Sequence, residues 1–138
     1  MNKRLLWSCS TLLLFVLSGC DQNFSLVSDD AVNTPGILTI HAMPPHDITL
    51  SVHDEDFKGH WKASVVDESA RIRQSYGAGS KTYQQYVAGL GDHYLRHGHA
   101  SLQGAKGTAM ECDFDYRGKG NGAGSCVDSN GEKYKMIL

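Results

Sequence analysis

The sequence lacks three features that would place it in familiar functional classes. Its 13 Lys and Arg residues form no basic run and are outnumbered by 15 Asp and Glu residues, which argues against nucleic acid or anionic lipid headgroups as partners. Only two of its four cysteines lie beyond residue 20, too few for the usual cysteine-rich zinc site. Its one long apolar run, residues 5–17, is shorter than the roughly 20 residues of a membrane-spanning helix.

The amino-terminal segment has the layout of a secretory signal. Lys3 and Arg4 precede the apolar run, and the tetrapeptide LSGC at residues 17–20 ends it. This ending resembles the lipobox of bacterial lipoproteins, in which the cysteine is acylated and becomes the first residue after cleavage. The resemblance implies that residues 1–19 are a signal peptide and that Cys20 carries the lipid. It places the chain on a bacterial membrane, facing the periplasm, and leaves the inner and outer membranes as alternatives.

The segment after Cys20 suggests how the chain is divided. Removing residues 1–19, whose only charged residues are Lys3 and Arg4, leaves 119 residues with 11 basic and 15 acidic side chains and a formal charge of −4. This length suits one small domain. Residues 20–35 are polar and show no strong periodicity, so we expect a lipidated, flexible tether there. Residues 36–138 then form a single β-rich domain.

The first half of that domain shows short periods of two. Strands are predicted at 36–43, 47–53 and 60–66, with the proline pair at 44–45 and the acidic run at 54–56 as the turns between them. One short helix is possible near 81–88, with Ser80 as its N-cap, and an irregular excursion is the alternative there. The fold class is mainly β, a small antiparallel sheet or barrel.

The last third of the chain predicts a four-strand antiparallel meander, with strands at 95–104, 108–116, 122–128 and 132–138. The loops AKG and SNG each place glycine third in a three-residue connection, where a residue with positive φ follows a type I turn. Loop geometry sets the register. Leu102 then faces Met110 in the first hairpin, and Cys126 faces Tyr134 in the last.

Four alternating glycines in the stretch GKGNGAGSC, residues 118–126, need an explanation, because glycine weakens a strand interior. A phosphate-binding loop would require glycines that open a helix, followed by lysine and serine or threonine, and that context is missing. Centring the middle hairpin on Lys119 places Phe114 opposite Gly124. The glycines therefore clear one strand face for aromatic side chains. The same register sets Cys112 opposite Cys126, which predicts a disulfide.

Histidine and aspartate meet on the outer face of the same meander. His97 lies across from Asp115, and His99 lies across from Asp113. Two histidines and two carboxylates could ligate a divalent metal, but such cross-strand pairs are also ordinary on a solvated sheet face. We expect no metal and no other cofactor. The remaining histidines of the domain, His41, His46, His53 and His60, are scattered along the first strands and predict no second cluster.

From Gly98 onward the chain resembles a group of small, mostly uncharacterised proteobacterial lipoproteins and secreted proteins. The shared pattern is a G-x-A-x-L strand, an M-x-C strand, a G-x-G-x-C strand and a final G-x-x-Y strand. The resemblance implies the fold and the cellular address and no reaction. No motif identifies a catalytic residue. We therefore expect a non-enzymatic binding or accessory module with an envelope protein as partner; the alternative is an enzyme-inhibitor or immunity-type lipoprotein of the periplasm.

Overall fold

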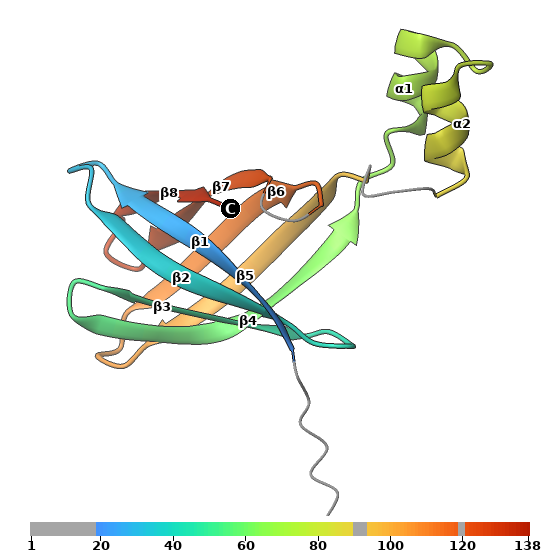
Figure 1. The fold of residues 1–138 in the computed structure, drawn as a ribbon. Helices are drawn as coiled ribbons and strands as arrows, with labels where there is room; N and C mark the ends of the chain where they lie inside the picture. The colour runs from blue at the N-terminus through green and yellow to red at the C-terminus, as the bar shows by residue number, and fades with distance from the viewer. Residues whose placement is uncertain (1–18, 90–93, 119–120) are drawn as a thin grey trace, which may run out of the picture.

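The computed structural model describes residues 19–89, 94–118 and 121–138. Eight antiparallel strands form a closed barrel, in which consecutive strands pair and β1 pairs with β8 (Figure 1). A pair of short helices stands between β4 and β5. The elements are β1 Cys20–Ser28, β2 Asn33–Ile40, β3 His46–Val52, β4 Glu55–Val65, α1 Ser69–Tyr76, α2 Lys81–Val87, β5 Arg96–Gly104, β6 Ala109–Tyr116, β7 Gly122–Asp128 and β8 Lys133–Ile137.

This architecture confirms the predicted mainly β class and decides for the barrel over an open sheet. Side chains alternate between the two faces of each strand, as in the pattern of β5, where every second residue from Gly98 to Gly104 is buried. Large apolar side chains occupy the interior, so the barrel has a packed core. Its fully buried members include Leu26, Leu38, Ile48, Met110, Phe114 and Met136. None of the helices in the described part of the chain has the length and apolar character needed to cross a membrane.

The register predicted for the meander is confirmed. Leu102 pairs with Met110, and Cys126 pairs with Tyr134. In the two three-residue loops, Gly107 has φ of 98° and Gly131 has φ of 86°, the conformation that the type I turn plus glycine requires. The four strands of the meander, β5 to β8, begin and end within one residue of the predicted positions.

The middle hairpin also has the predicted register, which explains Gly122 and Gly124, the two glycines that lie in β7. Gly118 lies in the connection with φ of 56°, and the predicted centre of the turn, Lys119, lies with Gly120 outside the described residues. Phe114 pairs with Gly124, and a Cβ at Gly124 would collide with the Asp113 carbonyl and with Phe114 Cβ. A glycine that the sequence analysis did not assign, Gly98 in β5, lies under the ring of the same phenylalanine. Phe114 is therefore accommodated by bare positions on both neighbouring strands.

Cys112 and Cys126 form the predicted disulfide inside the barrel, where both residues are fully buried. It links neighbouring strands across 14 residues of sequence. In the chain-entropy model a closed loop of about 15 residues stabilises the folded state by about 3 kcal/mol.

The prediction of a flexible tether at residues 20–35 is wrong. Residues 20–28 are β1, and Phe24 and Leu26 point into the core with 3% and 0% of their surface exposed. β1 joins β2 to β8 and so closes the barrel. The strand was hard to recognise because its alternation is broken: Gln22 on the inner face is polar, and Val27 on the outer face is apolar.

Several boundaries in the first half of the domain also differ from those expected. The strand predicted at 60–66 is β4, which begins already at Glu55. β2 begins at Asn33 rather than at 36 and ends at Ile40 rather than at 43, since its first residues pair with β1. The turn placed at residues 54–56 is wrong: it consists of His53 and Asp54, whose φ values of 50° and 57° suit a two-residue type I′ hairpin.

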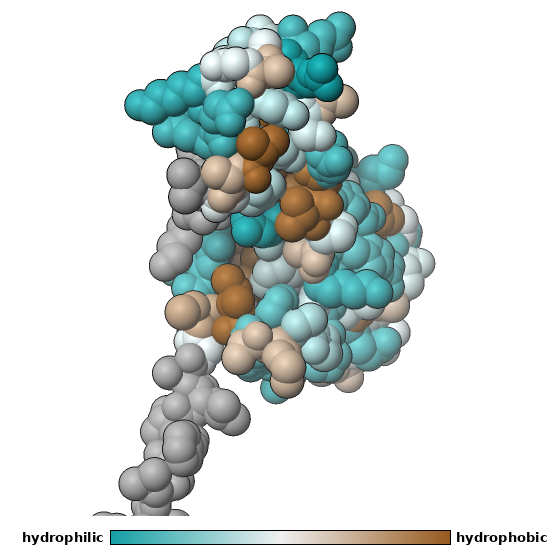
Figure 2. Space-filling view, turned by 90° about the vertical axis from the view of Figure 1, so that its right-hand side faces the viewer, coloured by the Kyte–Doolittle hydropathy of each residue, from teal (hydrophilic) through white to brown (hydrophobic). Residues whose placement is uncertain are grey.

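The connection between β4 and β5 contains two helices. The helix expected near 81–88 is confirmed as α2, and the Ser80 hydroxyl accepts the Tyr83 N–H at its N-terminus. α1 was not predicted. Glu68, which precedes α1, bonds to Arg117 of the β6–β7 connection, and this interaction lowers the pKa of Glu68 to about 2. The helical pair is thereby attached to the barrel beneath it, where Figure 2 shows hydrophobic side chains between them.

Candidate functional site

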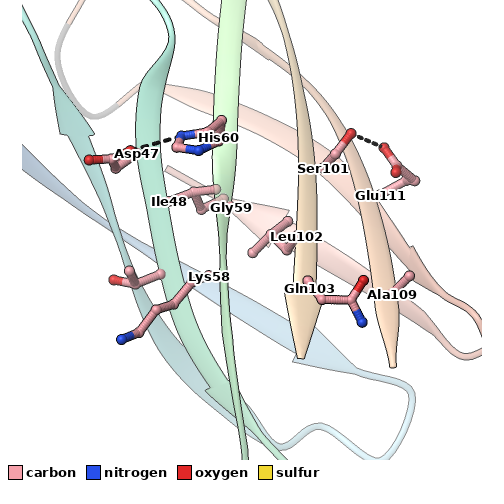
Figure 3. Close-up of a pocket in the computed structure, with 11 residues that line it drawn as sticks. Asp47, Ile48, Lys58, Gly59, His60, Ser101, Leu102, Gln103, Ala109 and Glu111 are labelled. Carbon is pink, nitrogen blue, oxygen red and sulfur yellow. Dashed lines mark hydrogen bonds and ion pairs between the residues drawn. The ribbon is translucent and has the colours of Figure 1, made fainter. Parts of the chain in front are cut away.

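A shallow groove of about 670 Å³ crosses the outer surface of β3, β4, β5 and β6 (Figure 3). Gly59 of β4 lies on its floor, where a Cβ would collide with the backbone of β5 at Ser101. The two strands therefore approach closely at this point. Polar side chains border the groove on both sides; they are Asp47, Thr49, Lys58, His60, Ser101, Gln103 and Glu111.

On one side of the groove a single carboxylate joins two histidines. Asp47 in β3 accepts from His41 Nε2 at 2.7 Å and from His60 Nδ1 at 2.9 Å. An ionised carboxylate can only accept, so both ring nitrogens donate. The hydrogen bond from His41, followed by the one from His60, lowers the pKa of Asp47. Asp47 is therefore an anion held between two imidazole rings.

This second histidine cluster was missed, and the statement that these histidines are scattered is wrong for His41, His46 and His60. The β3–β4 hairpin pairs Asp47 with His60, and the preceding loop returns His41 to the same place. His46 packs on the Trp61 ring with 4.6 Å between centroids. Burial, followed by the charge of His41, lowers the pKa of His46. A two-residue turn placed at residues 53–54 would have predicted the pairing of Asp47 with His60.

β5 and β6 carry the four predicted side chains next to the groove but outside its lining. The structure joins them in one row, in which His97 Nε2 also lies 3.6 Å from Asp113 and His99 Nε2 lies 3.1 Å from Glu111. His97 Nδ1 lies 2.7 Å from Asp115 Oδ1, and His99 Nδ1 lies 2.8 Å from Asp113 Oδ1. The Ser101 hydroxyl continues this row by donating to Glu111 at 2.7 Å. Within the residues that the structure describes, no group of three or more His, Cys, Asp or Glu side chains is arranged to hold a metal ion.

Asp47, His60 and Ser101 lie in line on three adjacent strands, in the order of a serine hydrolase triad. Nucleophilic catalysis requires a hydrogen bond between the serine and the histidine. The Ser101 hydroxyl instead points away from His60 and donates to Glu111, while the His60 ring bonds to Asp47 (Figure 3). Across the described residues, no hydrogen bond joins His60 to Ser101. The groove therefore presents donors and acceptors without an activated nucleophile.

Replacing Asp115 with asparagine is expected to lower the pKa of His97. The hydrogen bond that His97 donates to Asp115, together with the negative charges of Asp115 and Asp113, raises the pKa of His97 above its ordinary 6.5. This pair consequently stabilises the folded state fully below about pH 6.5, and the contribution is lost as the pH rises through the folded-state value. An NMR titration of the imidazole resonances measures the change. Asp29→Asn, in a distant loop, is the control, and an unaltered His97 titration in the Asp115 variant would contradict the pairing.

Comparison with known protein families, curated proteins and solved structures finds no match to this chain.

Proposed function

We propose that this chain is a bacterial envelope lipoprotein, acylated at Cys20, whose barrel binds a protein partner and catalyses no reaction. The observation that carries the binding role is the groove over β3–β6 with its two bordering rows of polar side chains. The observation that supports the anchor is the lipobox-like sequence at residues 17–20.

The groove suits recognition of a protein surface. Its polar side chains project from paired strands, so they are held in place before a partner arrives, and less conformational entropy is lost on binding. It offers both charge signs, since Lys58 lies on the face that also holds Asp47 and Glu111. Mixed charges of this kind select a complementary partner and orient it during encounter.

The interior of the barrel supports a binding role on the outer surface. Side chains such as Phe114, Leu38 and Met136 fill it, so a ligand in the lumen would have to displace the core. The serine in the groove is hydrogen-bonded to Glu111 and not to His60, whose ring bonds to Asp47. Both features favour a binding module over an enzyme.

Site-specific cross-linking in cells tests the binding role. A photoreactive residue at Thr49 or Gln103, both exposed on the groove, is expected to capture the same envelope protein. The same residue at Lys135, exposed on the outer face of β8, should not capture it. Among the described residues that line the groove, Lys58 is the only Lys or Arg. We expect Lys58→Glu to reduce the cross-linking yield about tenfold, because a like-charge contact costs at least about 1.4 kcal/mol.

Lys133→Glu, which makes the same charge change on the exposed side of β8, is the matched control and should leave the yield unaltered. Equal capture from the groove and from position 135, or equal loss in both lysine variants, would refute the groove as the binding surface.

A further inference from the structure

We infer that the loop between β2 and β3 rests in the interface of the lipid bilayer, next to the acylated cysteine. The inference depends on the lipid anchor proposed above and adds an orientation of the barrel on the membrane. The loop has the sequence AMPP at residues 42–45, and all four residues are exposed. Met43 at its tip has 78% of its surface exposed, the largest value among the exposed large hydrophobic residues of the described chain.

The loop lies beside the anchor because β1 begins at Cys20. Cys20 pairs with Ile40, the last residue of β2, and paired strands are about 5 Å apart. A Cβ at Gly19 would lie 3.7 Å from Nδ1 of His41, the first residue after β2. In Figure 1 the start of β1 and the β2–β3 loop lie together at the lower end of the barrel. Because Cys20 is itself the first residue of β1, no tether separates the lipid from the barrel. A lipid on Cys20 therefore brings this end of the barrel to the membrane.

The loop has a defined shape. The His41 N–H donates to His46 Nδ1 across its base at 3.1 Å, and the His41 ring donates to Asp47. His46 is fixed in turn by its contact with the Trp61 ring. A loop closed in this way presents its apolar tip with little further ordering, which favours insertion at an interface.

The β2–β3 loop differs in charge from the hairpin loops at the opposite end of the barrel. All four hairpin loops at the opposite end carry a charged residue: Asp29 and Asp30, Asp54, Lys106, and Glu132. The β2–β3 loop carries none in residues 42–45, and the two carboxylates that flank Thr39 near the end of β2, Asp21 and Asp47, are negative. A loop with apolar residues and no cationic side chain suits the hydrophobic boundary of a bilayer rather than its anionic headgroups.

Depth-dependent fluorescence tests this placement in the complete, acylated protein. Met43→Cys, labelled with an environment-sensitive fluorophore and reconstituted into phosphatidylcholine vesicles, is expected to show blue-shifted emission. Nitroxide groups on the lipid chains should quench it, and aqueous iodide should not. Lys106→Cys, in an exposed loop of the opposite end, is the matched control with the reverse quenching pattern. Ala42→Cys provides a second position in the same loop, so one misfolded variant does not decide the result.

The outcomes separate the orientation from the anchor. The anchor is shown to be present if the protein floats with the vesicles and the Cys20 thiol does not react with a thiol label. If the protein floats and position 43 is as accessible to iodide as position 106, the orientation is refuted and the anchor stands. A blue shift that increases with the protein-to-lipid ratio, in a fluorophore that the lipid nitroxides do not quench, would assign the loop to contact between copies of the chain instead. A protein that does not float, and whose Cys20 reacts with the label, refutes the anchor and the orientation together.

Discussion

Replacing Gly124 with valine is expected to destabilise the barrel by at least about 1–3 kcal/mol, the usual cost of overpacking. The first carbon of any side chain at this position would collide with the Asp113 carbonyl and with Phe114 Cβ. Both obstacles belong to the backbone or lie directly beside it, so no rotamer change relieves them. Urea unfolding monitored by circular dichroism measures the loss.

Ala123→Val, on the neighbouring residue of the same strand, is the matched control. Ala123 is exposed on the outer face of β7, where a strand accommodates a β-branched residue well. The free energy of unfolding of the Ala123→Val variant should therefore change little. Equal destabilisation in the two variants would show that the assigned facing of β7 is wrong.

A double-mutant cycle can separate the two glycines that surround Phe114. A Cβ at Gly98 would meet the far atoms of the phenylalanine ring, whereas a Cβ at Gly124 would meet backbone and Cβ atoms that alanine retains. Phe114→Ala should therefore offset much of the cost of Gly98→Ala and leave the cost of Gly124→Ala nearly additive. Additivity in both pairs would contradict the ring position.

Replacing Cys20 with serine is expected to abolish incorporation of a fatty-acid probe and to move the protein from the membrane fraction to the soluble fraction. The proposed anchor is the acylated cysteine, and serine has no thiol to accept the lipid. Stable attachment needs more than one acyl chain, so losing the acylated residue removes the whole attachment rather than weakening it. Cell fractionation with probe labelling measures both effects.

The barrel itself should tolerate this change. Cys20 is exposed at the first position of β1 and forms no disulfide, and serine has nearly the same size. An unaltered unfolding midpoint of the released protein confirms that the fold is intact. Membrane retention of Cys20→Ser at the native level would refute the anchor.

The hairpins of the last third could be predicted because their pairing is local. Short loops with glycine at a defined position set the register, and from that register follow the Cys112–Cys126 disulfide, the contact of Phe114 with Gly124 and the meeting of His97 with Asp115. Each of these contacts joins residues fewer than about 20 positions apart, so composition and turn chemistry were sufficient.

The pairing of β1 could not be predicted in this way. Ser25 lies opposite Ile137 in β8, and no turn connects the two strands. β1 has apolar residues on its inner face, notably Phe24 and Leu26, but the break in its alternation made the segment resemble a tether. Only closure of the barrel decides that this segment is a strand, because two sheet edges are unpaired without it.

The sequence by itself thus determined the mainly β fold class and, in the C-terminal hairpins, the loop geometry and the register, since these depend on neighbours along the chain. The tertiary structure alone decided that residues 20–28 close the barrel, that Gly98 accommodates the Phe114 ring, and that Asp47 joins His41 to His60 beside the groove. These features depend on how strands curve around a common core and on which elements meet at a barrel end. Such contacts are set by packing in three dimensions and leave only a weak pattern in the local sequence.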